Sequence, residues 1–245
     1  MIFQRKFDTA LITGATSGIG AAFADVLPSE TNLLLTGRRE TRLQSALRRL
    51  SLPGRRVEIV AADLSTKPGR TAVIRRADAS GIDLFICNAG AGVYGPFLSH
   101  GETEELEALE LNVVACVQLV RGLLPGMLAR AHESGKRAGI VIVASRAALG
   151  PVPELATYAA SKAFQLRFAQ ALADELKNEP IDVLALCPSY TNTEFFRQSG
   201  APPPARDMMP AVTVARDALA SLGRRAVHFS GKRLQVFALM EMLLR

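Results

Sequence analysis

The sequence predicts an α/β fold in which a parallel sheet lies between two layers of helices. Short apolar runs alternate along the chain with longer segments whose apolar residues recur at helical spacing. Strands that are apolar along their whole length are typical of sheets covered on both faces. Parallel neighbours also need a crossover between them, and the intervening helical segments can supply it.

The expected elements follow in alternation. In the first half, strands are expected at 9–13, 32–36, 57–61 and 83–87, with helices at 18–27, 42–50 and 71–79. In the second half, helices at 104–130 and 155–178 flank a strand at 140–144, and a sixth strand follows at 181–187. Residues 226–231 are expected to form a short seventh strand, and an apolar-faced helix is expected to continue to Arg245. Because the crossovers are right-handed, the expected closure is a three-layer, doubly wound Rossmann sheet of about seven strands.

The whole chain, 1–245, is expected to form one domain, because no linker or repeat interrupts it. The least regular region, 192–212, contains three consecutive prolines and follows the sixth strand. In a doubly wound sheet, ligands bind beside the carboxyl ends of the strands, which is where this segment should lie. We expect it to be a substrate lid; an inert loop is the alternative.

Composition and charge exclude several classes of function. Hydrophobic residues make up 49% of the chain, enough for a buried core, and the net charge is +6. The arginine pairs that carry much of this charge are dispersed and lack interleaved aromatic residues, so no nucleic-acid partner is expected. No apolar run reaches the roughly 20 residues of a membrane span, and the amino-terminal residues do not form a signal peptide.

The three cysteines, Cys87, Cys116 and Cys187, lie in apolar stretches and form no CxxC motif. They are expected to be reduced core thiols, which favours a cytoplasmic location. The three histidines are isolated from one another and from acids at ligand spacing, so no metal site is expected.

A glycine-rich turn joins the first expected strand to the first expected helix. Small residues let the backbone approach a pyrophosphate closely, and the helix N-terminus offers unpaired N–H donors and a positive dipole. A glycine turn alone is a weak signal, but its position between strand and helix strengthens it. The expected cofactor contacts here are Gly14, Thr16, Ser17, Gly18, Ile19 and Gly20.

Arg38 and Arg39 end the second expected strand. An NAD enzyme of this architecture needs an acid near this position to bind the ribose hydroxyls, whereas an NADP enzyme needs a cation for the 2′-phosphate. A guanidinium can bind a phosphate bidentately, and a carboxylate would repel it. The pair therefore predicts NADP(H), with Arg38 as the better candidate; the alternative is that both arginines begin a solvated helix.

Tyr158 and Lys162 are four residues apart on an expected helix and so share one face. Ser145 directly follows the fifth expected strand, which brings its hydroxyl to the same edge of the sheet. Reduction of a carbonyl by hydride requires a proton donor, and a free tyrosine has a pKa near 10. A nearby ammonium favours the phenolate, so Lys162 is expected to lower the pKa of Tyr158 and to hold the nicotinamide ribose.

Asn112 lies in an otherwise apolar helical stretch, where a buried amide must find hydrogen-bond partners. We expect it to fix a water molecule that relays protons to Lys162.

Together these motifs resemble those of the short-chain dehydrogenase/reductase superfamily. The resemblance covers residues 8 to 193 and rests on Thr13-Gly14-x-x-x-Gly18-x-Gly20, Asn88-Ala89-Gly90, Asn112, Ser145, Tyr158-x-x-x-Lys162 and Pro188. It implies a catalytic tetrad of Asn112, Ser145, Tyr158 and Lys162, acting on a small-molecule carbonyl or alcohol. It implies further cofactor contacts from Asp63, Leu64, Asn88, Ala89, Gly90, Pro188, Thr191 and Thr193.

Some positions depart from the family pattern. Ser189 stands where the family usually has glycine, Thr191 replaces a usual aliphatic residue, and the common carboxyl-terminal motif is missing. The expected assembly is therefore a homodimer through the helices at 104–130 and 155–178, with a tetramer as the alternative. A non-catalytic dinucleotide-binding protein and a different chemistry on the same fold, such as epimerisation or dehydration, are the alternatives to hydride transfer.

Overall fold

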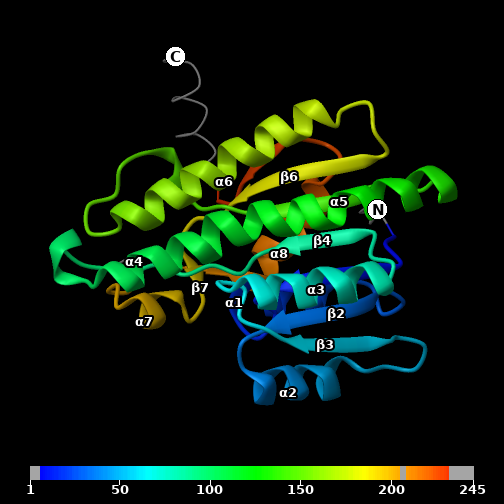
Figure 1. The fold of residues 1–245 in the computed structure, drawn as a ribbon, viewed down its shortest axis with the longest axis horizontal. Helices are drawn as coiled ribbons and strands as arrows, with labels where there is room; N and C mark the ends of the chain where they lie inside the picture. The colour runs from blue at the N-terminus through cyan, green and yellow to red at the C-terminus, as the bar shows by residue number, and fades with distance from the viewer. Residues whose placement is uncertain (1–5, 205–207, 232–245) are drawn as a thin grey trace.

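The computed structural model describes residues 6–204 and 208–231, which build a seven-stranded sheet with every strand parallel to its neighbours (Figure 1). The strands are β1 (Thr9–Thr13), β2 (Asn32–Gly37), β3 (Val57–Ala61), β4 (Leu84–Cys87), β5 (Ala138–Val143), β6 (Ile181–Cys187) and β9 (Val227–Phe229). Their order in the sheet is β3-β2-β1-β4-β5-β6-β9, so the direction of winding reverses between β1 and β4. The predicted doubly wound fold is confirmed, and this reversal is the point at which such sheets bind ligands.

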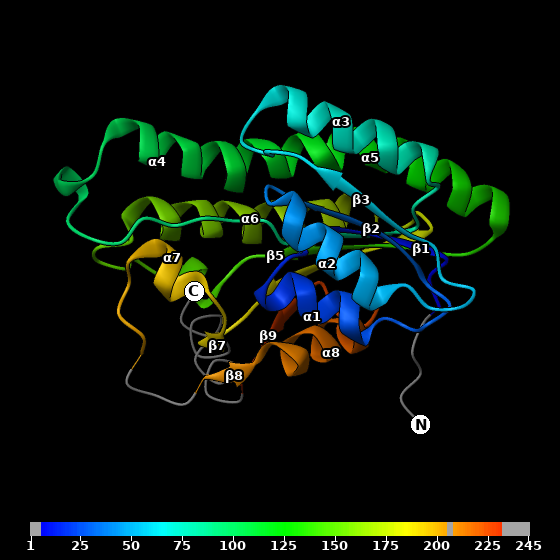
Figure 2. The same cartoon turned by 90° about the horizontal axis from the view of Figure 1, so that it is seen from below.

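Helices cover both faces of the sheet (Figure 2). One face carries α1 (Gly18–Val26), α2 (Glu40–Leu50) and α8 (Ala211–Ser221). The other carries α3 (Lys67–Ala79), α5 (Ala115–Ser134) and α6 (Ala156–Glu175), and α4 (Glu102–Leu109) precedes α5. Short elements complete the described chain: 3-10 turns at Phe97–Ser99 and Arg146–Leu149, α7 (Phe195–Ser199), and the paired strands β7 (Thr191–Asn192) and β8 (Met209–Pro210).

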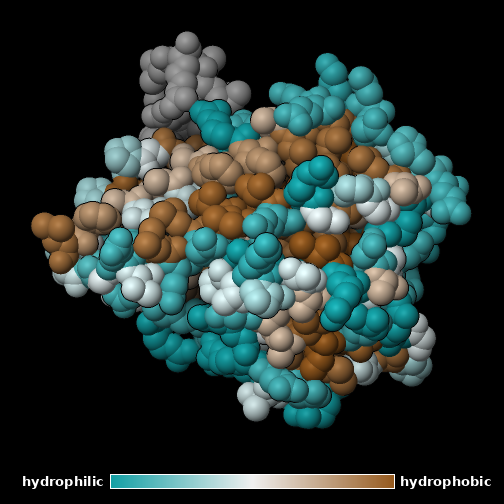
Figure 3. All heavy atoms as spheres, in the orientation of Figure 1, coloured by the Kyte–Doolittle hydropathy of each residue, from teal (hydrophilic) through white to brown (hydrophobic). Residues whose placement is uncertain are grey.

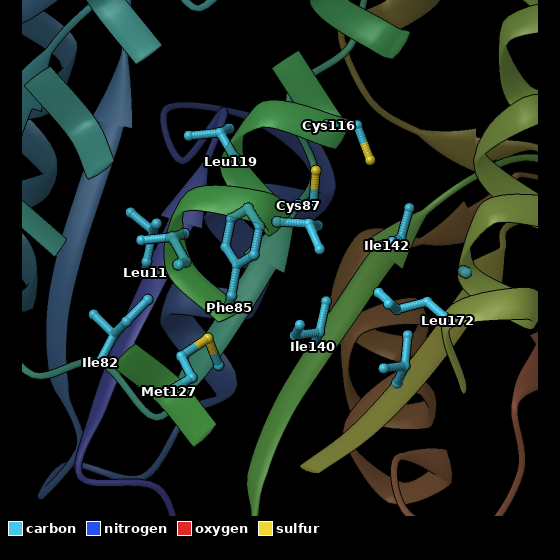
Figure 4. Close-up of a cluster of buried hydrophobic side chains, with 14 of the residues drawn as sticks. Leu11, Ile82, Phe85, Cys87, Cys116, Leu119, Met127, Ile140, Ile142 and Leu172 are labelled. Atoms are coloured by element: carbon cyan, nitrogen blue, oxygen red, sulfur yellow. The ribbon is translucent and has the colours of Figure 1, made fainter. Parts of the chain in front are cut away.

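The core consists of two apolar layers, one on each side of the sheet. Successive residues of a strand point to opposite faces, so Phe85 of β4 belongs to one layer and Ile86 to the other. Figure 4 shows the first layer, in which side chains of β1, β4 and β5 meet those of α5. Cys87 and Cys116 lie in this layer with their sulfur atoms facing each other, and both are free thiols, as is Cys187.

The long predicted helix at 104–130 is longer than expected and is not one regular helix. It extends from Glu102 to Ser134 and contains a π-helical turn, Glu110–Val114, in which the Ala115 N–H donates to the Glu110 carbonyl. Such turns insert one residue into a helix and are frequent at functional sites. Asn112 lies within this turn.

Among the described residues, the run Glu102–Ser134 is also the one helix that could span a membrane by length and composition, because an 18-residue window within it has a mean hydropathy of 1.6. Its α5 portion packs against the sheet through Ala115, Cys116, Leu119, Val120, Leu123, Met127 and Ala131. Burial in the core therefore accounts for much of this apolar character.

Other element boundaries also differ from expectation, and capping explains the start of α3. Helix α3 begins at Lys67 rather than at 71, because the Thr66 side chain accepts a hydrogen bond from Gly69 N at 3.2 Å and Pro68 occupies the first turn. The seventh strand exists but is shorter than expected, with three residues paired to β6. The helix expected from there to Arg245 lies outside the described residues.

Candidate active site

A cavity of about 560 Å³ opens along the carboxyl ends of the central strands. Its wall includes the glycine turn, Arg38, Tyr158 and the segment that follows β6, which passes from Pro188 to Thr193 beside Gly18 and to Glu194 beside Arg39. The predicted residues in its wall are Gly14, Thr16, Ser17, Gly18, Ile19, Arg38, Arg39, Asp63, Leu64, Asn88, Ala89, Gly90, Ser145, Tyr158, Lys162, Pro188, Thr191 and Thr193. Two predicted residues, Gly20 and Asn112, lie behind the wall rather than in it.

Thr13 and Asn88 hold the glycine turn in place. The Thr13 hydroxyl accepts hydrogen bonds from Asn88 N at 2.9 Å and from Ala89 N at 3.0 Å. In return, the Asn88 side-chain amide donates to the Thr13 carbonyl at 2.9 Å. Since Thr13 ends β1 and Asn88 follows β4, these bonds join the two strands at which the winding reverses. Thr13 is a supporting residue that the sequence did not single out beyond its place in the motif.

Glycine is required in this turn for two reasons. Gly14 and Gly18 have φ angles of +64° and +55°, which L side chains rarely adopt. At Gly20 the constraint is space: a Cβ there would lie 2.3 Å from the Gly14 carbonyl oxygen. Gly20 therefore acts by letting helix α1 approach the turn, which explains why it is absent from the cavity wall.

Arg38 and Arg39 both line the cavity but have different neighbours. Arg38 lies close enough to Asp63 to stabilise its carboxylate: burial opposes ionisation, but hydrogen bonds from Ser65 and the Arg38 charge keep the pKa of Asp63 below its ordinary value. Arg39 instead lies 3.7 Å from Glu194, which also pairs with Arg42 at 2.8 Å. Arg38 is thus the arginine of the pair that does not share the Glu194 carboxylate.

Ser145 and Tyr158 both line the cavity, and the Ser145 hydroxyl lies close enough to the Tyr158 hydroxyl to influence its pKa. Ser145 follows β5 and caps the turn Arg146–Leu149, its hydroxyl accepting from Ala147 N at 3.1 Å. Desolvation raises the pKa of Tyr158 to about 12, against the smaller effect of the Ser145 hydrogen bond. The expected lowering by Lys162 is not found in this state, because burial dominates and the Lys162 nitrogen is 5.7 Å from the centre of the Tyr158 ring.

Lys162 is only 4% exposed. Its ammonium donates to the Val143 carbonyl at 2.9 Å and to Gln165 Oε1 at 2.7 Å. Desolvation lowers the pKa of Lys162 to about 8, partly offset by the nearby thiols of Cys87, Cys116 and Cys187. Tyr158 and Lys162 both line the cavity from one face of α6, as their spacing predicted.

Asn112 is fully buried, and protein groups satisfy its side chain. Its Nδ2 donates to the Ala91 carbonyl at 2.8 Å and to Ser161 Oγ at 2.9 Å, while its Oδ1 accepts from Ala91 N at 2.9 Å. Protein groups also link Asn112 to Lys162. Gln165 Nε2 donates to the Asn112 main-chain carbonyl at 2.8 Å, so the Gln165 side chain connects Asn112 to Lys162.

Aromatic side chains line the space beside Tyr158. Phe195 of α7 packs on the Tyr158 ring with 4.9 Å between ring centres, and Phe196 packs near Tyr190 at 6.3 Å. Across the cavity, the Tyr94 hydroxyl donates to Glu154 at 2.5 Å. These residues come from segments far apart in the sequence, and their meeting depends on the fold, so sequence spacing did not bring them together.

Part of the predicted lid belongs to the cavity. Thr193, Glu194, Phe195, Phe196, Gln198, Ala201, Pro202, Pro203 and Pro204 all line it. Residues 205–207 of the segment lie outside the described chain. Over residues 6–204 and 208–231, no group of three or more His, Cys, Asp or Glu side chains is placed to hold a metal ion.

Comparison with known proteins places these features in a family. The family model described as short chain dehydrogenase matches residues 8–203. The chain is 30% identical over 221 residues to the human inactive hydroxysteroid dehydrogenase-like protein 1, covering 87% of this chain and 65% of that protein. It is 33% identical over 225 residues to the very-long-chain 3-oxoacyl-CoA reductase of Kluyveromyces lactis, covering 88% and 63% of the two chains. The chain thus spans less than two-thirds of the length of both proteins.

Solved structures agree over nearly the whole chain. A short-chain dehydrogenase from Sphingobium yanoikuyae in complex with NADPH superposes with a TM-score of 0.84 at 29% identity, covering 96% of this chain and 94% of that one. The L-sorbose reductase of Gluconobacter frateurii, complexed with NADPH and L-sorbose, gives a TM-score of 0.80 at 28% identity, with coverages of 94% and 97%. The family match spans strands β1 to β6, the glycine turn, Ser145, Tyr158 and Lys162, and we conclude that the chain belongs to the short-chain dehydrogenase family.

Proposed function

We propose that the protein is an NADP(H)-dependent oxidoreductase that transfers a hydride between the nicotinamide and a carbonyl or secondary alcohol, with Tyr158 as the general acid/base. The observation that carries this proposal is that Tyr158, Ser145 and Lys162 line one cavity wall, with the Ser145 hydroxyl close enough to Tyr158 to influence its pKa. A hydroxyl pair beside a buried ammonium can bind a carbonyl oxygen and protonate it.

The cavity fits the proposed cofactor. Its glycine turn leads into the N-terminus of α1, where backbone donors suit a pyrophosphate, and Arg38 in the same wall suits a 2′-phosphate. Lys162 also lines the cavity and would hold the nicotinamide ribose. The NADPH complexes of two structural relatives support this choice of cofactor.

NADPH, when bound, supplies the hydride for reduction. The Tyr158 hydroxyl donates a proton to the oxygen that was the carbonyl oxygen, and Ser145 Oγ holds that oxygen by a hydrogen bond. Because the pKa of Tyr158 is about 12, its phenol is protonated at neutral pH and ready to donate. The Lys162 ammonium then stabilises the phenolate left behind.

The test is a panel of ketones, aldehydes and secondary alcohols, followed by NADPH absorbance, with Tyr158→Phe as the variant. Loss of the proton donor is expected to lower kcat by about 10²–10⁴-fold. Tyr94→Phe removes a different hydroxyl from the same cavity and should lower kcat far less than Tyr158→Phe, because the Tyr94 hydroxyl donates to Glu154 and is not the proposed proton donor. Turnover by Tyr158→Phe at the wild-type rate would show that the assigned mechanism is wrong.

A second candidate function is dinucleotide binding without catalysis. It is favoured by the name of the human relative, which describes that protein as inactive. The two candidates separate in one experiment, because a non-catalytic protein would bind NADPH with a measurable Kd and oxidise none of it with any compound of the panel.

We also propose a homodimer through the long helices. Large apolar side chains are exposed near α4 and on α6: Phe97 at 61%, Leu98 at 94%, Leu106 at 52% and Phe164 at 39%. Figure 3 shows apolar surface over the face that carries α4, α5 and α6.

The free thiols support the proposed cytoplasmic location, which fractionation of the source cells would check.

A further inference from the structure

Gln165 is a fully buried polar residue that the proposed chemistry does not use. It lies one turn after Lys162 on α6, with an exposed fraction of 0%. Its side-chain oxygen accepts from the Lys162 ammonium at 2.7 Å, and its side-chain nitrogen donates to the Asn112 main-chain carbonyl at 2.8 Å. Burial of an amide is costly unless it is satisfied, so these two contacts account for its presence in an apolar layer.

Chemistry settles which way the Gln165 amide points. A reversed amide would set its NH₂ donors against an ammonium, which has only donors, and its oxygen against a carbonyl, which has only acceptors. The observed orientation is therefore the one in which both contacts are attractive. It also directs the negative end of the amide dipole at the Lys162 charge, which favours the charged form in a site where burial lowers the pKa of Lys162 to about 8.

The residue that accepts the hydrogen bond from Gln165 is itself held in place. The carbonyl that receives Gln165 belongs to Asn112, in the π-helical turn between α4 and α5. The Asn112 side chain is itself held by Ala91 and Ser161 through three hydrogen bonds. Through its two hydrogen bonds, Gln165 thus fixes the Lys162 ammonium relative to the π-helical turn.

We propose that Gln165 is a positioning residue: it anchors the Lys162 ammonium and joins it to the Asn112 carbonyl by an amide. This proposal rests on the proposed function. Val143 and Gln165 together take two of the three N–H donors of Lys162. A third donor remains for a ligand in the cavity, whose wall Lys162 lines.

This arrangement has a consequence for proton movement. A water molecule can accept a proton on one side and release another, but a carboxamide has no proton on its oxygen to pass on. Proton relay from Lys162 along this path would therefore stop at Gln165, although the hydrogen bonds continue to the Asn112 carbonyl. The proton that restores Tyr158 after a reduction must then enter from the cavity side.

Three substitutions test the proposal. Gln165→Met keeps most of the volume and removes both polar contacts. Gln165→Ala removes the contacts as well but leaves a polar gap, between a carbonyl and an ammonium, that suits a bridging water. Gln170→Met is the matched control, because Gln170 lies on the same helix and hydrogen-bonds Arg167 at 3.0 Å, away from Lys162.

The measurements are NADPH affinity from pH 6 to 10 by fluorescence, without turnover, together with kcat and the thermal midpoint of each variant. For Gln165→Met we expect kcat to fall by about tenfold or more through misplacement of Lys162. We also expect the alkaline decline in NADPH affinity to begin about one pH unit lower, because the ammonium has lost an acceptor.

Gln165→Ala separates positioning from packing. If Gln165 served only to fill space, Met would be the milder change in both stability and activity. If Gln165 positions Lys162, the two variants should rank oppositely in stability and activity. Gln165→Ala should have a lower thermal midpoint than Gln165→Met but a higher kcat, because a water molecule can restore the hydrogen-bonded link. Gln170→Met should match the wild type in kcat and in the pH dependence of NADPH affinity.

The proposal is overturned if Gln165→Met keeps the wild-type pH dependence of NADPH affinity, or if kcat follows the thermal midpoint across the Met and Ala variants. Failure of the proposed function is a separate result. A wild-type protein that binds NADPH but reduces no carbonyl compound would refute the function, and the pH dependence of binding would still decide the role of Gln165.

Discussion

Arg38 and Arg39 are neighbours in the sequence, yet in the structure different carboxylates lie beside them. Arg38 influences Asp63, whereas Arg39 lies beside Glu194. A phosphate that approaches Arg39 must therefore compete with a carboxylate that is already present. Arg38 likewise lies beside a carboxylate, that of Asp63, so the preference for Arg38 over Arg39 as the 2′-phosphate ligand stays a prediction.

Arg38→Ala should weaken NADPH binding by about tenfold or more, since a charge-assisted hydrogen bond contributes about 1.5–3 kcal/mol. NADH lacks the 2′-phosphate, so its affinity should change little. Arg48→Ala removes an exposed arginine whose guanidinium donates to Ser45 and serves as the control. The measurement is the Kd of each cofactor by fluorescence titration, and equal losses for both cofactors would refute the phosphate assignment.

At this scale the sequence predicted the residues whose position follows from local spacing. Tyr158 and Lys162 share a helix face, and Ser145 ends up beside them because it directly follows a strand. Gln165 was missed, although a signal existed: it is an amide between Phe164 and Leu166, three positions after the lysine. Its partner, the Asn112 carbonyl, could not be predicted, because that contact depends on how α6 packs against the π-helical turn.

The glycine turn and helix α1 act as one element. Their close approach depends on Gly20, where a Cβ would also lie 2.5 Å from the Asn88 side-chain nitrogen. Any side chain at this position must push the helix away from the turn or displace Asn88. Both movements would disturb the backbone donors proposed for the pyrophosphate.

Gly20→Ala should therefore destabilise the protein and weaken NADPH binding together. In an ordinary helix the same change is stabilising by about 1 kcal/mol, so the sign of the effect is diagnostic. We expect a loss of about 1–3 kcal/mol in the free energy of unfolding, as in other overpacked sites. Gly150→Ala is the control, because a Cβ there meets no atom within 4 Å. Denaturant unfolding and NADPH titration check both effects, and a stabilised Gly20→Ala protein would contradict the explanation.

Strand positions were predictable because a strand in a covered parallel sheet must be apolar throughout, and β1, β3 and β6 match their expected bounds. The interruption of the 102–134 helix was not predictable from periodicity. One inserted residue shifts the apolar face slightly without removing it, and Asn112 was the sole visible sign. Helix starts were misjudged where a cap such as Thr66 decides them.

For the molecule as a whole, the doubly wound topology followed from alternation and handedness, but the shape of the cavity did not. The aromatic wall of Phe195, Phe196 and Tyr190 forms only when the segment after β6 folds back beside Tyr158. Sequence periodicity carries no information on such long-range loop contacts.

The exposed apolar surface over α4 and α6 gives a test at the same scale. If the proposed dimer uses this face, Phe164→Glu should bury a charge at the interface and produce monomers, as measured by light scattering after gel filtration. Leu52→Glu places the same charge on an exposed apolar residue between α2 and β3 and is the control. A dimer that survives Phe164→Glu would assign the contact to another surface.

The raised pKa of Tyr158 bears on the direction in which the protein would work. With a pKa of about 12, only about one phenol in 10⁵ is ionised at pH 7. In nearly every protein molecule Tyr158 is therefore protonated and able to donate to a carbonyl oxygen. The ionised form, which would accept a proton from an alcohol, is rare. If Tyr158 is the general acid/base as proposed, the ligand-free site would therefore offer a proton donor at neutral pH, and alcohol oxidation would be expected to speed up as the pH rises.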